Sequence, residues 1–171
     1  DFIICDHHRP GEELPAAVAV LDPKRDDCPY PYKELSGCGI GFKLVQGIAQ
    51  RNGIAPSELE PLLDLVAVST ACDIVPVTGE NRVLTHFGLK RVNQDPRPGI
   101  RAMMQMANVK KRLGVSELVF TIGPRINAAG RIEHGRQAVE LLLAKDLAQA
   151  EQIGLRVDGN NTARQELDKH I

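Results

Sequence analysis

Two short runs of apolar residues near the start of the chain predict buried strands. Phe2 to Cys5 is continuously apolar, a pattern typical of a strand covered on both faces. Ala16 to Leu21 has the same character and ends at Asp22-Pro23, where proline cannot continue a hydrogen-bonded ladder. We therefore expect two strands joined by a polar loop.

Helical spacing replaces this pattern further along the chain. Apolar residues recur every three or four positions from Cys38 to Gln50, with Ser36-Gly37 suited to a helix start and Asn52-Gly53 to its end. A second helix, beginning at Pro56-Ser57, has few polar gaps between its leucines and valines at 59, 62, 63, 65, 66 and 68. We expect that helix to be buried on nearly every side.

The second half of the chain has few strand signals. Helical patterns cover 79–93, 97–107, 137–143 and 146–171, the last long and charged, and a short apolar element covers 116–122. Short strands alternating with helices in the first part predict an α/β fold, followed by a helical segment.

Composition restricts the classes of function. Lys and Arg number 21 against 22 Asp and Glu, so no overall positive field attracts nucleic acid and any polyanion site must be local. The sequence has neither a membrane-spanning apolar run nor a signal peptide before the first strand, so we expect a cytoplasmic protein without membrane contacts. The four cysteines lack CxxC spacing and are expected to be reduced, mostly buried thiols.

An acid and two imidazoles follow the first predicted strand directly. Asp6, His7 and His8 stand at its carboxyl end, where open α/β sheets hold their ligands. Carboxylate and neutral imidazole together suit manganese, iron, cobalt or zinc. The alternative is a polar turn in which Asp6 acts as a cap and both histidines are solvated. The triplet is rare in a chain of this length, so it is the first candidate site.

Asp73 is the second candidate because it ends a strongly apolar helix. An acid is unfavourable there, since the carboxyl end of a helix carries partial negative charge. A metal ion would offset that charge, and so would a nearby lysine or arginine, or simple exposure to water. The local sequence does not choose among these.

A third candidate is the run Gly123-Pro124-Arg125-Ile126-Asn127-Ala128-Ala129-Gly130-Arg131. Its proline and glycines predict an irregular backbone, and its two arginines offer forked donors for phosphate. The alternative is a tight connection between helices with the arginines paired to acids. Between Arg97 and Arg131 the chain has seven basic residues and one acid, Glu117, which favours a local polyanion site over a solvated face.

These stretches together resemble the DHH phosphoesterase family, and within it the RecJ type of exonuclease. The resemblance rests on CDHHRPGEELPAAVAVLDP from Cys5, LLDLVAVSTACDIVPVTGENR from Leu62, RPGIRAMM from Arg97 and GPRINAAGRI from Gly123, in the family's order and spacing. It implies the C-terminal part of a DHH-type parallel-sheet domain over residues 1–145. Residues 146–171 would begin the connector helix to a second domain.

The resemblance also implies the chemistry of the site. Asp6, His7, His8 and Asp73 would be catalytic, at a centre of two Mn²⁺ or Mg²⁺ ions. His7, His8 and Asp73 are the candidate metal ligands: one imidazole would bind metal and the other would contact the scissile phosphate. We favour His7 as the ligand.

The implied activity is 5′→3′ hydrolysis of phosphodiester bonds in single-stranded DNA, in repair and recombination. Arg125, Asn127 and Arg131 would hold the DNA backbone. Single-strand binding protein and a helicase are the candidate protein partners, and we expect a monomer.

Two further aspartate-rich motifs supply most other metal ligands in the family, and we expect them before Asp1. The 171-residue chain alone is therefore expected to be inactive. The alternatives are another DHH phosphoesterase, such as an oligoribonuclease or nucleotide phosphatase, and a RecJ-like scaffold protein without catalysis.

Overall fold

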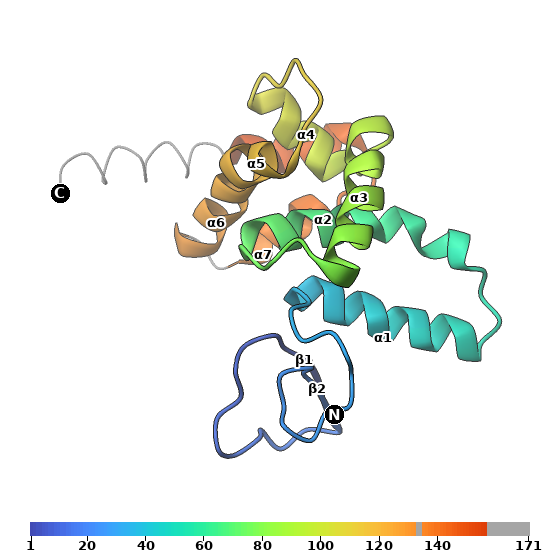
Figure 1. Ribbon diagram of the computed structural model, residues 1–171. Coiled ribbons are helices and arrows are strands. Elements are labelled where there is room, and N and C mark those ends of the chain that lie inside the picture. Colours follow the sequence, from blue (N-terminus) through green and yellow to red (C-terminus); the bar gives the residue numbers. More distant parts are fainter. Residues whose placement is uncertain (133–134, 157–171) are drawn as a thin grey trace. The chain divides into compact units, whose positions relative to one another are not determined.

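The computed structural model describes residues 1–132 and 135–156, with the backbone alone over 128–132. The chain forms two compact units, Asp1–Arg91 and Val92–Ile171. No helix in the described ranges is long and apolar enough to cross a bilayer. The elements (Figure 1) are β1 Ile3–Cys5, β2 Ala19–Leu21, α1 Gly37–Arg51, the 3₁₀ helix η1 Pro56–Leu62, α2 Leu63–Cys72, α3 Gly79–Gln94, α4 Pro98–Met106, α5 Val115–Glu117, the π-helix η2 Leu118–Ile122, α6 Gly123–Ile132 and α7 Arg136–Leu142.

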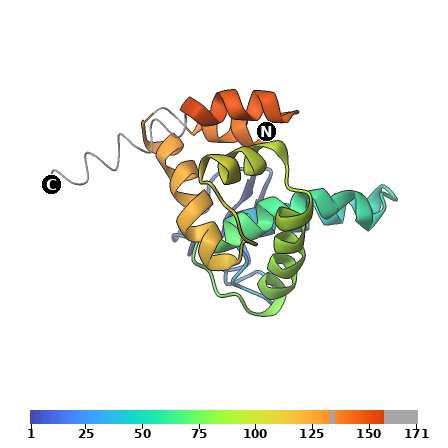
Figure 2. The same cartoon turned by 90° about the horizontal axis from the view of Figure 1, so that it is seen from above.

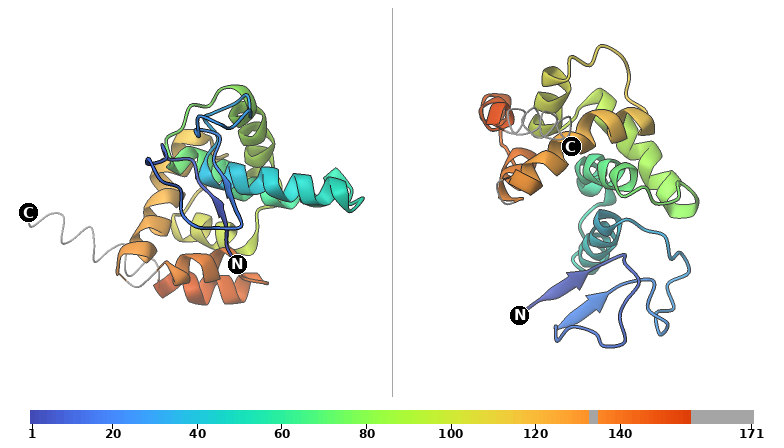
Figure 3. Two further views of the ribbon diagram at one scale, coloured as in Figure 1. Left: turned by 90° about the horizontal axis from the view of Figure 1, so that it is seen from below. Right: turned by 90° about the vertical axis from the view of Figure 1, so that its left-hand side faces the viewer.

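The first unit contains a small parallel sheet, which confirms the α/β class. Ile3, Ile4 and Cys5 of β1 pair with Ala19, Val20 and Leu21 of β2, and the two arrows lie side by side in the right-hand view of Figure 3. The backbone N–H of Asp6 extends the ladder by donating to Leu21 O. Because the strands are parallel, their carboxyl ends lie at one edge, where the loop from Asp6 begins.

Helix α1 begins and ends where the sequence predicts. The Ser36 hydroxyl caps the helix by accepting from the backbone N–H of Gly39 at 3.2 Å. Asn52 forms the C-cap, and Gly53 follows with φ +67°, a left-handed conformation that glycine adopts without steric cost.

The helix predicted from Pro56 onwards is instead two elements. Residues Pro56–Leu62 form a 3₁₀ helix, and the α-helix begins at Leu63. Pro61 explains the difference, because it lacks the N–H that an α-helical hydrogen bond needs. Burial is also narrower than expected: Val66 and Ala67 of α2 are fully buried, while Leu59 in η1 is only half-buried.

The core of the first unit joins its helices to the segment before α1. Its buried members are Leu35, Ile40, Phe42, Val66 and Leu84. Helix α3 also lies directly against α2, because a Cβ at Gly88 would collide with the carbonyl oxygen of Leu63. These contacts fix the position of the carboxyl end of α2, where Asp73 stands.

The second unit is helical over its described part, as the sequence predicts. Helix α4 packs on α7 so closely that a Cβ at Gly99 would collide with the carbonyl oxygen of Leu141. The fully buried side chains include Ile100, Met103, Leu118, Ile122 and Leu141. A further helix covers 147–156. The rest of the predicted connector helix lies outside the described residues, and the domain division at 145 stays a prediction.

The backbone from Gly123 to Ile132 is helical, so the irregular turn predicted there is wrong. Helix α6 continues directly from η2, and Figure 2 shows these turns following one another, in gold and orange. The Gly123 N–H reaches back to Leu118 O, the wide π-type bond that precedes Pro124. Pro124 has no N–H to donate to the preceding turn, and the helical run continues past it through this wider turn.

Candidate metal centre

Asp73 lies at the carboxyl end of α2, in a sharp turn. Its backbone N–H donates to Ser69 O at 2.8 Å, and it forms the C-cap of the helix. The next residue, Ile74, has φ +54° and is 82% exposed. A β-branched residue in the left-handed region is rare, because its side chain crowds the backbone. The helical conformation therefore ends immediately after the carboxylate.

His7 faces this carboxylate from the end of β1. Its Nε2 lies 3.8 Å from Asp73 Oδ2, and the two side chains are 16% and 34% exposed. The ring packs against the first turn of α1, where a Cβ at Gly37 would lie 3.6 Å from His7 Cδ2. His7 Nδ1 is buried and has no hydrogen-bond partner among the described residues. The structure thus brings together two residues that are distant in sequence.

Asp6 organises the loop rather than facing Asp73. Its Oδ1 accepts the backbone N–H of His7 at 2.7 Å and of His8 at 3.2 Å, and lies 2.7 Å from His8 Nδ1. The hydrogen bond from the His8 ring, helped by the backbone bonds and opposed by burial, holds the pKa of Asp6 below its ordinary value. Asp6 is therefore ionised at neutral pH, so Nδ1 of His8 carries the shared proton. His8 is 78% exposed, with its ring centroid 4.4 Å from that of His7.

Ser69 links Asp73 to the start of α1. Its hydroxyl donates to Asp73 Oδ2 at 3.0 Å and accepts the backbone N–H of Cys38 at 3.4 Å. A second contact lies beside it, where the buried hydroxyls of Ser36 and Thr70 are 3.3 Å apart. These bonds hold the carboxyl end of α2 against the amino end of α1, which also supports the His7 ring.

The segment after Asp73 is fastened to the chain that precedes α1. The Asn81 side chain is fully buried and donates to the carbonyl oxygens of Glu34 and Pro76. The Tyr32 hydroxyl donates to Thr78 O at 2.8 Å, and its ring covers Gly79, where a Cβ would collide with it. The loop from Asp73 to α3 is thus held at several points.

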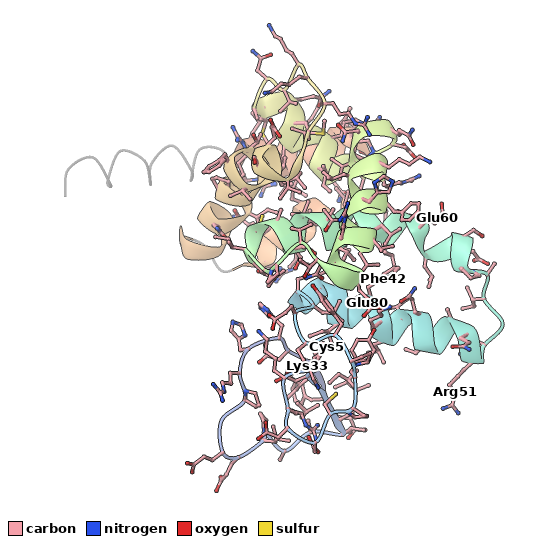
Figure 4. The ribbon with its side chains drawn as sticks, viewed as in Figure 1. Cys5, Lys33, Phe42, Arg51, Glu60 and Glu80 are labelled. Carbon is pink, nitrogen blue, oxygen red and sulfur yellow. The ribbon has the colours of Figure 1, made fainter. Side chains whose placement is uncertain are left out.

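Glu80 adds an ion pair to this attachment, beside α1 (Figure 4). Its two carboxylate oxygens each lie 2.6 Å from a partner, Oε1 from Lys43 Nζ and Oε2 from the Tyr30 hydroxyl. Burial opposes ionisation of Glu80, but the bonds from Lys43 and Tyr30 outweigh it and lower the pKa of this carboxyl. Burial and the neighbouring Glu80 raise the pKa of Tyr30, which therefore stays a donor.

The donors at this place fit part of a divalent metal site. Imidazole and carboxylate suit Mn²⁺, and 3.8 Å is too long for a hydrogen bond but close to the separation of two ligands of one ion, about 3 Å or slightly more. The unpartnered Nδ1 of His7 is the other ring nitrogen and does not face Asp73. No group of three metal-ligating side chains occurs among the described residues. Further ligands would have to be water or lie outside that part of the chain.

Cysteine is a poor candidate for those ligands. All four cysteines are free of disulfide bonds, but they are half-buried and not mostly buried as expected. Burial, together with the charge of Asp73, raises the pKa of Cys72 to about 11. The Cys72 thiol is therefore protonated at neutral pH while no metal ion is bound.

The three predicted DNA contacts lie in the second unit, on α6. Arg125 is half-buried and donates from Nη1 to Thr121 O at 2.8 Å, and Asn127 is exposed. The Arg131 side chain lies outside the described residues. Positions 127 and 131 are one helical turn apart, whereas position 125 lies on the opposite side of the helix from 127. The three positions therefore do not form one stripe.

Sequence reasoning missed the residues that hold the candidate metal ligands in place. Ser69 could have been found, because it lies four positions before Asp73 on the same face of a helix. Asn81 and Tyr32 had no such signal, since their buried hydrogen bonds join segments far apart in sequence.

Comparison with known proteins agrees with this architecture. Residues 1–70 match the model of the DHH family, N-terminal domain. Single-stranded-DNA-specific exonuclease RecJ of Dickeya dadantii is 41% identical over 97% of this chain, and that of Escherichia coli is 39% identical over 98%. The chain spans 31% of the length of each. RecJ of Bacillus subtilis is 40% identical, and 21% of its length is covered.

Solved structures match as well. A crystal structure of RecJ from Thermus thermophilus in complex with Mn²⁺ superposes with a TM-score of 0.85 at 32% identity, covering 98% of this chain and 25% of that one. Another, exonuclease RecJ bound to manganese, has a TM-score of 0.84 at 32% identity, covering 98% and 42%. The chain is therefore similar to the DHH family over residues 1–70 and, over nearly its whole length, to part of the RecJ exonucleases.

Proposed function

We propose that this chain is part of a metal-dependent exonuclease that hydrolyses single-stranded DNA from the 5′ end, in repair and recombination. The observation that carries the proposal is the pairing of His7 Nε2 with Asp73 Oδ2 at the carboxyl end of the parallel strands. The likeness to single-stranded-DNA-specific exonucleases named RecJ supports the substrate.

His7 and Asp73 would hold the metal. Two Mn²⁺ or Mg²⁺ ions, when bound, neutralise phosphate charge and lower the pKa of a water molecule. Ser69 fixes the Asp73 carboxylate by donating to Oδ2, and the His7 ring packs beside Gly37 at the start of α1. The ligands are thus positioned by hydrogen bonds and packing that are present without the ions.

Asp6 and His8 would act on the phosphate side of the site. Asp6 Oδ1 accepts a hydrogen bond from Nδ1 of His8, and this bond fixes the orientation of the His8 ring. His8 Nε2 then remains available to a scissile phosphate, because the side chain is exposed. His8 remains a second candidate metal ligand, with its Nδ1 already committed to Asp6.

Of the three predicted DNA contacts on α6, Arg125, Asn127 and Arg131, the last two would contact the DNA backbone directly. Because position 125 lies on a different side of the helix from 127, we propose that the strand passes the face of 127 and 131. Arg125, which donates to Thr121 O, would then act mainly by supporting this helix.

Residues 1–145 would form part of the DHH domain, with the connector helix from 146. We further propose a monomer in the cytoplasm, with single-strand binding protein and a helicase as partners. These assignments rest on the family likeness.

The test is degradation of single-stranded DNA labelled at either end by the protein as the cell makes it, with Mn²⁺ and with EDTA. We expect metal-dependent release of mononucleotides, beginning at the 5′ label, and much slower attack on duplex DNA. The 171-residue chain in isolation is expected to release none.

Two results would contradict the proposal. Preferential cleavage of dinucleotides over long strands would indicate an oligoribonuclease-like or nucleotide-phosphatase-like enzyme of the same family. Absence of both cleavage and Mn²⁺ binding by the intact protein would indicate a catalytically inactive scaffold. For variants that replace the Asp73 carboxylate by an amide, the matched control is Glu12→Gln, which also removes one negative charge but lies on the exposed loop after the DHH triplet.

A further inference from the structure

Three consecutive cations stand on the loop between α4 and α5 in the second unit. Lys110, Lys111 and Arg112 are all exposed. In Figure 1 this is the yellow loop between the α4 and α5 labels, and in Figure 4 its side chains extend away from the ribbon. The segment 109–113 is called the basic loop below.

Both ends of the basic loop are fixed to the helices beside it. Helix α4 is followed by Asn108, with φ +51°, and the N–H of Val109 donates to Met104 O at 3.0 Å. At the other end, the Asn93 amide donates to Leu113 O at 2.9 Å and accepts from Leu113 N at 2.8 Å. Leu113 itself is buried. The loop is therefore ordered before any ligand arrives, which lowers the entropic cost of binding.

Positive charge on this loop is not balanced locally. Lys111 Nζ lies 3.3 Å from Glu117 Oε1. Among the described residues, neither Lys110 nor Arg112 has a carboxylate within ion-pair distance, so the loop keeps two positive charges in excess. By contrast, Arg136 pairs with Glu140 elsewhere in the unit. An excess of charge at one exposed place attracts a polyanion more strongly than evenly mixed charges do.

A hollow of ≈ 440 Å³ lies beside the loop, with a size in the range of ligand sites. Its walls are the three cations with Asn93, Gln94, Met104 and Val109. Arginine and lysine suit phosphate oxygens, and the Gln94 amide can donate to phosphate or base. The hollow has no aromatic wall, which disfavours a protein partner, since such partners bind mainly through buried aromatic anchors.

We propose that the basic loop is a holding site for the phosphate backbone of a nucleic-acid strand, separate from the residues that cleave it. The identity of the strand as single-stranded DNA rests on the proposed function. The loop binds by charge and carries no sequence preference. Its role is to retain the strand, so its loss affects long substrates more than short ones.

The test compares the variant K110Q/R112Q with K90Q/K145Q in the intact protein. Both variants remove two exposed lysine or arginine charges, but the second leaves the basic loop unchanged. Binding of a fluorescent strand of about 40 nucleotides is measured by anisotropy over a range of KCl concentrations, without divalent metal. We expect K110Q/R112Q to reduce the slope of log K against log[salt] by about 1.4, which corresponds to two lost phosphate contacts. K90Q/K145Q is expected to match the unmodified protein.

Equal slopes in both variants and the unmodified protein would overturn the proposal, as would an equal loss in both variants. Retained DNA binding with lost binding to anionic phospholipid vesicles would also overturn it. K110R/R112K, which keeps the charge, is expected to restore the slope and so excludes misfolding as the cause. Cleavage separates this proposal from the proposed function: K110Q/R112Q should keep its kcat on a four-nucleotide strand and raise KM on the long one. If the unmodified protein cleaves no DNA, the proposed function is wrong. The salt dependence of binding still shows in that case whether the basic loop contacts the phosphate backbone.

Discussion

The turn around Asp73 and the basic loop are both polar and both fixed by hydrogen bonds, but they use their charges differently. At the turn, the Asp73 carboxylate accepts a bond from Ser69, which is itself bonded to the start of α1. On the basic loop the backbone ends are fixed, Lys111 pairs with Glu117, and the side chains of Lys110 and Arg112 are exposed without a carboxylate partner among the described residues. The turn can therefore select a ligand by geometry, whereas the loop can select only by charge. Variants in the two regions should consequently differ in their dependence on metal and on salt.

Replacing a proposed ligand should give the largest difference between the regions. Asp73→Asn removes the anionic donor that faces His7 and should lower Mn²⁺-dependent cleavage by more than about 100-fold, beyond what changes around a metal ligand usually cost. Titration with Mn²⁺, followed by the electron paramagnetic resonance of the free ion, should show the matching loss of affinity. Glu12→Gln is the control. Normal Mn²⁺ affinity in Asp73→Asn would show that the Asp73 carboxylate is not a metal ligand.

Asn81→Ala should show how strongly the turn is fastened. The change leaves the carbonyl oxygens of Glu34 and Pro76 without their buried donor, at a cost of about 2–3 kcal/mol in the free energy of unfolding. Urea denaturation of the chain measures it. Gln50→Ala, which removes an exposed amide on α1 outside this attachment, is the comparison. A loss below about 0.5 kcal/mol in Asn81→Ala would mean that the other bonds hold the loop without it.

Ser69→Ala should weaken Mn²⁺ binding about tenfold while leaving the fold intact. The hydroxyl donates to Asp73 Oδ2, and groups that orient a metal ligand typically contribute a factor of this size. Isothermal titration calorimetry with Mn²⁺ is the measurement, and Ser69→Thr, which keeps a hydroxyl, should recover most of the affinity. An unchanged affinity in Ser69→Ala would show that Asp73 keeps its orientation from the backbone turn alone.

The smallest effect is expected from the charge of Glu80. Its pKa in the folded chain is lowered from the ordinary 4.5, so its ion pair stabilises the fold above that pH and is lost as the pH falls through the lower, folded value. Partial exposure limits the contribution to less than about 1 kcal/mol. Urea denaturation at about pH 7 and pH 3 should show the unmodified chain losing more stability than Glu80→Gln. Glu58→Gln, on an exposed part of η1, should behave like the unmodified chain.

The sequence predicted those elements of the fold whose signals are local. The strand before Asp6 and the capped helix from Ser36 follow from short apolar runs and a single hydroxyl. The prediction was wrong where one proline or glycine was interpreted without its position: Pro61 divides a helix that periodicity treats as one, and Pro124 lies inside a helical run instead of a turn.

The candidate site divides in the same way. The triplet from Asp6 and the turn at Asp73 were each noticeable in sequence, but their approach within 3.8 Å depends on the packing of α1 against α2. No period relates residues so far apart, and only the family resemblance joined them. The supporting bonds of Tyr32 and Asn81 have no sequence signal, because a buried polar residue looks like an exposed one until its partner is known.

The left-handed backbone conformation of Ile74 predicts which residues selection would favour at this position beside Asp73. A left-handed φ at a branched residue costs roughly 1–2 kcal/mol, which glycine or asparagine would largely avoid. A mutant library sorted for heat resistance should therefore enrich those two residues at position 74. Selection for catalytic turnover would favour glycine or asparagine only if the altered turn still orients the Asp73 carboxylate correctly. The two selections together would show whether Ile74 trades thermal stability for the orientation of that carboxylate.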